Sequence, residues 1–193
     1  LSYPAELLEV LFVDGLSTDN TAELLSAAIK ENEPYKVLRC PERGKIKQLN
    51  FALTHIKNEI IVNSDVDARL THDALEWIAA EFAADHNVAV VGAYCSPADA
   101  IDIERYYWSS HNKGRLLEND LRSSSIVIAQ CYAFCGGLIR AFPEDVIADD
   151  IYIAFIAHVR GAKVVYSRHA KALETRSPKT QSDFIRHKFR KSN

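Results

Sequence analysis

Methionine, long apolar runs and closely paired cysteines are all missing from this sequence of 193 residues. No run approaches the ~20 apolar residues that a membrane-spanning helix needs, and the first residues lack the layout of a signal peptide, so we expect a soluble chain. Because position 1 is not methionine either, we expect the sequence to be part of a longer protein. The cysteines form no CxxC pair and have largely apolar flanks, which indicates buried thiols in a reducing compartment and no zinc site: Cys40, Cys95, Cys131 and Cys135.

The charges are distributed unevenly, although the formal net charge is only −3. Residues 160–193 carry ten Lys and Arg against two acidic residues, whereas residues 1–159 carry 13 basic and 24 acidic residues. An acidic main body argues against a nucleic-acid-binding surface over the whole domain. The basic C-terminal segment leaves room for a local anion site.

Short β-prone apolar runs alternate with amphipathic helical patterns along most of the chain. Strands are expected at residues 8–13, 37–38, 60–62, 88–91, 126–134 and 163–166, and helices at 17–31, from 45, from 71, at 103–121, at 149–160 and from 181. This alternation predicts the α/β class, with a mostly parallel central sheet flanked by helices in a single domain over residues 1–193. In the helix at 149–160, the pattern places Ile151, Ala154, Phe155 and Val159 towards the core.

Acidic residues follow two of the expected strands directly. Asp14 comes after residues 8–13, and Asp65 and Asp67 come after residues 60–62. Ligands of open α/β sheets bind beyond the carboxyl ends of the strands, where one carboxylate can accept from a nucleobase or ribose and two can share a hard divalent cation. These acidic residues could also simply form turns or cap helices. For Asp149 and Asp150, which precede a helix, capping is the favoured interpretation on the residues alone.

Four blocks of the sequence, in the same order, resemble glycosyltransferase family two. LSYPAELLEVLFVDGLSTDNTAELL is similar to the family's second strand and following helix, and RGKIKQLNFAL to its Arg-x-Gly-Lys-x-x-x-Leu-Asn helix. VNSDVDARLTHDAL resembles its Asp-x-Asp strand end, and PEDVIADDIYIAFIAHVRGAKVVY its acidic pair before a helix, a glycine turn and a strand. The likeness covers roughly residues 1–190 and is weakest over 96–125.

The resemblance implies a GT-A (Rossmann-like) fold whose first strand would precede this chain. Residues 1–95 would form the nucleotide-sugar-binding half, and residues 96–193 the acceptor and catalytic half. The chain would then be an inverting transferase that moves a sugar from a nucleotide-diphosphate sugar, with UDP as the first choice, to a glycan or lipid-linked acceptor, as in polysaccharide biosynthesis.

The resemblance also implies roles for individual residues on the donor side. Asp14 would contact the base, while Arg43 and Lys45 would lie near the base and ribose. Asp65 would approach the ribose and the water shell of Mn²⁺ or Mg²⁺, and Asp67 would bind that metal directly.

On the acceptor side, the resemblance makes Asp150 the general base, with Asp149 beside it. Asp150 would remove the proton of the acceptor hydroxyl as its oxygen attacks the anomeric carbon. We therefore expect Asp14, Asp67 and Asp150 to face one common cavity.

The basic tail departs from the family pattern. Many polymer-making relatives carry Gln-x-x-Arg-Trp in a terminal helix, whereas this chain reads HKFRK, without Gln or Trp. Arg186, Lys188 and Arg190 could still serve a diphosphate or the acceptor. A solvated basic face leading towards a membrane explains them equally well, with association through segments outside this chain at the cytoplasmic face.

Two other classes fit parts of the sequence. Asp65 and Asp67 invite comparison with haloacid-dehalogenase phosphatases, but the fifth residue of DVDAR is Arg69 where that motif has Thr, and the motif follows two strand and helix units. A non-catalytic sugar-nucleotide-binding domain would keep the fold without turnover. Asp150 argues against it, because a binder needs no base.

Overall fold

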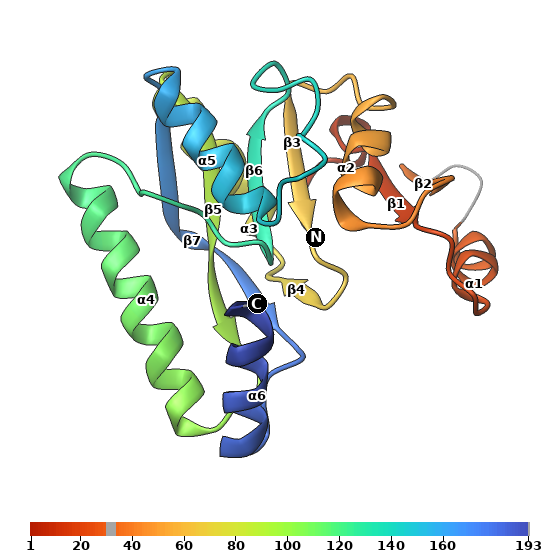
Figure 1. The fold of residues 1–193 in the computed structure, drawn as a ribbon. Coiled ribbons are helices and arrows are strands. Elements are labelled where there is room, and N and C mark those ends of the chain that lie inside the picture. The colour runs from red at the N-terminus through yellow and green to blue at the C-terminus, as the bar shows by residue number, and fades with distance from the viewer. Residues whose placement is uncertain (30–33, 193) are drawn as a thin grey trace.

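The computed structural model describes residues 1–29 and 34–192 (Figure 1). The strands are β1 (Val10–Asp14), β2 (Tyr35–Arg39), β3 (Ile60–Ser64), β4 (Ala68–Leu70), β5 (Val88–Pro97), β6 (Cys131–Cys135) and β7 (Lys163–Glu174). The helices are α1 (Thr21–Ala28), α2 (Lys45–Leu53), α3 (Ala74–Ala84), α4 (Asp102–Leu121), α5 (Asp149–Val159) and α6 (Gln181–Ser192), with a short 3₁₀ turn, η1, at Ala5–Leu7. The α/β class is confirmed.

The strands form two sheets, and the larger sheet is mixed, so the expectation of a mostly parallel sheet is wrong. β1 and β2 pair in parallel, and a second sheet has the order β3-β6-β5-β7-β4. Among the described strands of that sheet, β5 and β7 are parallel, and the other three pairs are antiparallel.

The path between β5 and β6 explains this reversal. α4 carries the chain back to the start of β7, where the Ser124 N–H donates to Val164 O at 2.9 Å. The following residues then cross to the end of β3, where Gln130 O accepts from the Asp65 N–H at 3.1 Å. β6 therefore starts at that end and runs against β5. The first half of the expected strand 126–134 is this crossing segment, and the strand itself begins at Cys131.

β4 was not expected from the sequence, and it forms one edge of the sheet directly after the Asp-x-Asp turn. Only residues 65–67 separate β3 from β4, although the two strands are at opposite edges of the sheet order. The long β5 and β7 shift register between Gly92 and Tyr94, and such bulges strengthen twist. Their second halves therefore curl, and Figure 1 shows β4 beneath the tip of β3.

Helices cover both faces of the larger sheet. α2 and α5 pack on one face, where Ile153 and Phe134 belong to one buried cluster, and α3 packs on the other through Leu75 and Ile78. α4 covers a third cluster around Trp108 and Tyr166. Among the described residues, no helix has the length and apolar content of a membrane span.

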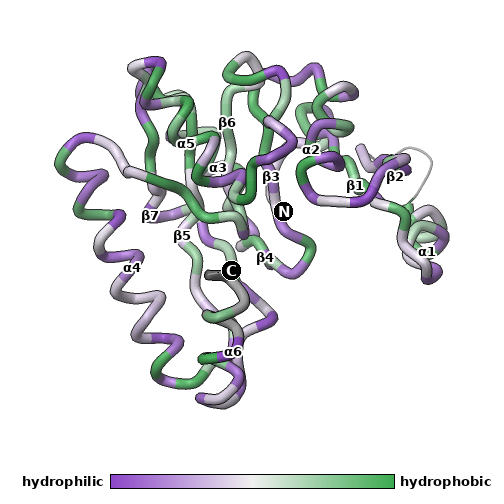
Figure 2. The backbone as a smooth tube through the Cα atoms, in the orientation of Figure 1, coloured by the Kyte–Doolittle hydropathy of each residue, from purple (hydrophilic) through white to green (hydrophobic). Residues whose placement is uncertain are grey.

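α5 faces the core with a different side from the one expected. Ile153 and Ala157 are fully buried together with Ala154, whereas Ile151, Phe155 and Val159 are exposed. α5 is apolar along most of its length (Figure 2), so periodicity alone could not select the buried side. The buried side carries the small Ala154 and Ala157, which belong to the same cluster as Ile153.

Candidate functional site

Three predicted site residues meet at the ends of three elements. Lys45 begins α2, Asp65 directly follows β3, and Asp149 begins α5. The Lys45 Nζ lies 3.0 Å from Oδ1 of Asp65 and 3.0 Å from Oδ1 of Asp149. Burial alone would lower the pKa of Lys45, but the charges of Asp149 and Asp65 outweigh it and raise that pKa, so the ammonium group remains charged.

Local backbone features fix Lys45 and the start of α5. Gly44 has φ 114°, a conformation that favours glycine, and this lets α2 begin sharply at Lys45. One turn further along α2, the Asn50 side chain pairs with both backbone groups of Phe142. Its Nδ2 donates to Phe142 O at 2.9 Å, and its Oδ1 accepts from the Phe142 N–H at 2.7 Å. α2 is thereby tied to the loop that leads into α5.

The two acidic residues at the start of α5 have different surroundings. Asp149 is buried, and its Oδ2 accepts from the Tyr132 hydroxyl at 2.7 Å and from Asn63 Nδ2 at 3.5 Å. Asp150 is partly buried. Burial and the charge of Asp149 raise the pKa of Asp150, against the opposing effects of a backbone N–H and Lys45. Asp149 is thus held by several partners, whereas the raised pKa of Asp150 makes its carboxylate a stronger proton acceptor than that of a free aspartate.

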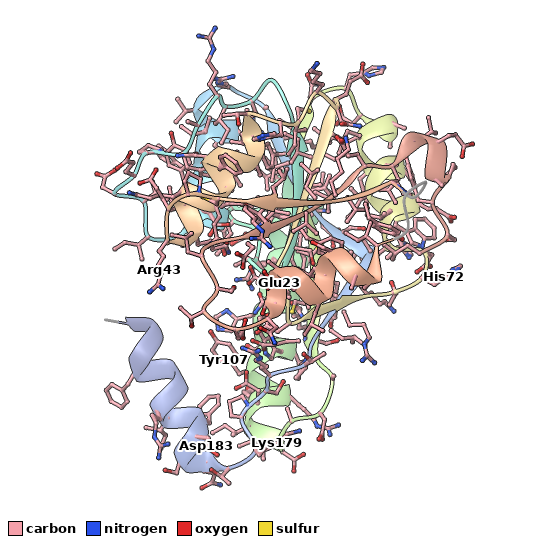
Figure 3. The ribbon with its side chains drawn as sticks, turned by 90° about the vertical axis from the view of Figure 1, so that its right-hand side faces the viewer. Glu23, Arg43, His72, Tyr107, Lys179 and Asp183 are labelled. Atoms are coloured by element: carbon pink, nitrogen blue, oxygen red, sulfur yellow. The ribbon has the colours of Figure 1, made fainter. Side chains whose placement is uncertain are left out.

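Asp14 and Arg43 belong to a neighbouring loop. The Asp14 carboxylate accepts from the Ser17 N–H at 3.3 and 3.4 Å, and Arg43 donates to Leu16 O at 3.5 Å. Figure 3 shows Arg43 pointing outwards from the body. Their position next to α2 is consistent with the donor side, but their described polar contacts are with this loop and not with the Lys45 cluster.

Asp67 turns towards the segment after β7. Its Oδ2 lies 3.9 Å from Arg176 Nε, and its backbone O accepts from the Thr175 N–H at 3.1 Å and the Thr175 hydroxyl at 2.8 Å. Over residues 1–29 and 34–192, no three His, Cys, Asp or Glu side chains gather as a metal cage. Mg²⁺ usually uses one or two carboxylates together with substrate phosphates and waters, so the donor chemistry of Asp65 and Asp67 fits such an ion.

Among the described side chains of the basic tail, Arg186 pairs within α6 and not with the Lys45 cluster. Arg186 is exposed and lies 3.7 Å from Asp183, near the start of α6 in Figure 3, and the side chains of Lys188 and Arg190 lie outside the described part. A hollow of about 750 Å³ opens instead between the starts of β5 and β7 and the ends of α4 and α5. It contains none of the predicted site residues, so the common cavity for Asp14, Asp67 and Asp150 stays a prediction.

Sequence reasoning missed Tyr132, Asn63 and Asn50. Tyr132 stood inside an expected strand, whereas Asn63 and Asn50 stood within two of the blocks that resemble the family, and none of the three was given a role. The available signal was chemical: a tyrosine within a buried apolar strand needs a partner for its hydroxyl.

Comparison with known proteins adds a family to this geometry. The model described as Glycosyl transferase family 2 matches residues 1–142. Among curated proteins, the chain is similar to a beta-monoglucosyldiacylglycerol synthase of Nostoc sp., 28% identical over 180 residues, which cover 82% of this chain and 36% of that protein. It is also similar to a chondroitin synthase of Pasteurella multocida, 28% identical over 112 residues, which cover 56% of this chain and 12% of that protein. The chain thus spans about a third of the first relative's length.

Solved structures share the fold. A mannosyltransferase from Pyrobaculum calidifontis, PcManGT, in complex with GDP-Man and Mn²⁺, superposes with a TM-score of 0.76 and 29% identity, covering 90% of this chain and 49% of that one. S. aureus TarS 1–349 in complex with UDP-GlcNAc gives a TM-score of 0.64 at 17% identity, covering 93% of this chain and 52% of that one.

Proposed function

This chain belongs to glycosyltransferase family 2 and has the GT-A fold, and from that premise we propose that it forms the catalytic part of an inverting, nucleotide-sugar-dependent hexosyltransferase. The observation that carries the proposal is the double contact of Lys45. One ammonium group joins Asp65, at the Asp-x-Asp turn, to Asp149, beside the proposed base. The proposed donor side and the proposed catalytic helix would therefore be adjacent.

In this mechanism Asp150 takes the proton of the acceptor hydroxyl while that oxygen displaces the nucleoside diphosphate in one step, which inverts the anomeric carbon. A divalent ion held by Asp67 and Asp65 would neutralise charge on the leaving diphosphate. Asp14 would accept from the base, with Arg43 and Lys45 near the base and ribose. Lys45 keeps Asp65 and the start of α5 in register.

We propose a UDP-sugar as donor, and the GDP-Man complex of the mannosyltransferase makes GDP-sugars the alternative to test. We propose a lipid-linked or glycan acceptor, which is supported by the names of the curated relatives. Residues 1–193 would form one domain, with a donor half at 1–95 and an acceptor half at 96–193. Membrane association would come from segments outside this chain, at the cytoplasmic face.

The phosphatase alternative loses its basis, because the chain belongs to another family and Asp65 is paired with Lys45. A non-catalytic sugar-nucleotide binder would keep donor affinity without turnover. Substitution of Asp150 separates the two remaining functions.

The test is Asp150→Asn, with Asp145→Asn as the matched control because Asp145 is an exposed acid in the loop before α5. Donor binding is measured by thermal shift with UDP and GDP, each with and without Mn²⁺. Turnover is measured with UDP-glucose, UDP-GlcNAc and GDP-Man over diacylglycerol vesicles. We expect Asp150→Asn to bind like the wild type and to lose about 10²–10⁴-fold in transfer, while Asp145→Asn stays active. Full transfer by Asp150→Asn would refute the assignment of the base.

A further inference from the structure

Tyr132 lies in β6, beneath the start of α5, and its side chain is completely buried. Its side chain is 0% exposed, and its hydroxyl donates to Asp149 Oδ2 at 2.7 Å. Burial, together with the charge of Asp149, raises the pKa of Tyr132 far above its usual range, so the hydroxyl stays protonated and acts as a donor. A buried phenol without such a partner would be costly.

The Asp149 carboxylate is held from both of its oxygens. Lys45 contacts Oδ1 from α2, and Tyr132 and Asn63 contact Oδ2 from β6 and β3. An almost wholly buried carboxylate is stable only with partners of this kind. Since Asp149 is the first residue of α5, these contacts fix the position of the helix start from three other elements.

We propose that Tyr132 is a positioning residue for sugar transfer: by holding Asp149, it fixes the first turn of α5 and thereby the direction in which Asp150 meets the acceptor. The inference rests on the proposed function, because it takes Asp150 as the base. Tyr132 touches no substrate in this arrangement. It acts through Asp149, and misplacement of a reacting group by about 1 Å can cost about 10²-fold in rate.

The decisive variant is Tyr132→Phe, which removes one oxygen and keeps the ring beside Phe134 at 6.1 Å between centroids. The matched control is Tyr166→Phe. Tyr166 is also 0% exposed, and its hydroxyl donates to Asn112 Oδ1 at 2.6 Å in the cluster under α4. The Tyr166 hydroxyl also accepts from the Cys95 N–H at 3.2 Å, so its loss removes at least as many buried hydrogen bonds. Both variants lose one buried hydroxyl, but only Tyr132 touches the start of α5.

Two measurements are made on both variants. For Tyr132→Phe we expect kcat to fall about tenfold to a hundredfold with donor KM nearly unchanged, whereas Tyr166→Phe should keep kcat. Amide hydrogen exchange, which needs no substrate, should become faster at the first turn of α5, where the Tyr152 N–H donates to Ala148 O at 3.0 Å, in Tyr132→Phe alone.

The path through Asp149 is tested by adding Tyr132→Phe to Asp149→Asn, where the tyrosine substitution should have no further effect on kcat. The inference is overturned if Tyr132→Phe keeps kcat, or if Tyr132→Phe and Tyr166→Phe lower kcat equally. It is also overturned if the kcat losses of Tyr132→Phe and Asp149→Asn multiply in the double variant. An unchanged exchange rate at the start of α5 would also overturn it. If the wild type transfers no sugar but hydrogen exchange at the start of α5 is still faster in Tyr132→Phe alone, the proposed function fails. The role of Tyr132 in fixing the start of α5 then stands.

Discussion

Replacing Asn50 with Ala tests the tie between α2 and the loop before α5. The substitution removes the two hydrogen bonds between the Asn50 amide and the backbone of Phe142, a residue only 3% exposed. Each bond contributes about 0.5–1.5 kcal/mol net, and backbone groups left without partners in a buried place cost more. We therefore expect a loss of about 2–3 kcal/mol in the free energy of unfolding.

The loss should appear in two assays. Urea unfolding followed by fluorescence of Trp77 and Trp108 should show a lower midpoint at an unchanged m-value. For a chain of this size, calorimetry should show a Tm lower by roughly 5–10 °C. The control is Asn58→Ala, an exposed asparagine just beyond the same helix, which should stay within about 0.5 kcal/mol of the wild type. An Asn50→Ala variant as stable as that control would refute the reasoning.

Three further outcomes are expected. Because the pKa of Asp150 is raised in the fold, its ionisation opposes folding above its unfolded pKa, so wild-type stability falls as pH rises through the window between the two values. Asp150→Asn should therefore have the higher Tm at pH 7, with the gap closing towards pH 4, and a lower Tm at pH 7 would contradict this. Asp67→Asn should abolish the extra thermal shift that Mn²⁺ gives with UDP but keep the shift from UDP alone, and a persisting Mn²⁺ effect would exclude Asp67 as a ligand. Ile153→Ala should cost about 2–5 kcal/mol by urea unfolding while Phe155→Ala, 60% exposed, costs far less, and equal losses would contradict the observed face of α5.

Local patterns predicted most elements within a few residues. The runs at β1, β3 and β5 are apolar, β-prone and bounded by turn residues, and α6 begins at Gln181, where it was expected. Strand direction was not predictable in the same way, because it depends on where a connection ends. The segment between α4 and β6 is apolar like a strand. It crosses the sheet before the chain begins to pair as β6 at Cys131.

The sequence motifs identified individual residues of the site but not the contacts between them. Asp65, Asp149 and Lys45 were singled out from the sequence, and the structure brings them together. Their mutual contacts were not predictable, because they join residues from α2, β3 and α5 that are far apart in the chain. Tyr132 shows the same limit, since the partner of its hydroxyl, Asp149, belongs to α5 and not to a neighbouring strand.

The Asp-x-Asp turn is fastened at both ends by distant parts of the chain. Gln130 accepts from the backbone of Asp65, and Thr175, which lies 108 positions after Asp67, holds the backbone of Asp67 with two hydrogen bonds. The conformational entropy of these three residues is therefore lost during folding, before any donor arrives. Under the proposed function, sugar-nucleotide affinity need not offset the ordering of this turn, so we expect a looser turn, as in Thr175→Ala, to weaken donor binding without removing a ligand contact.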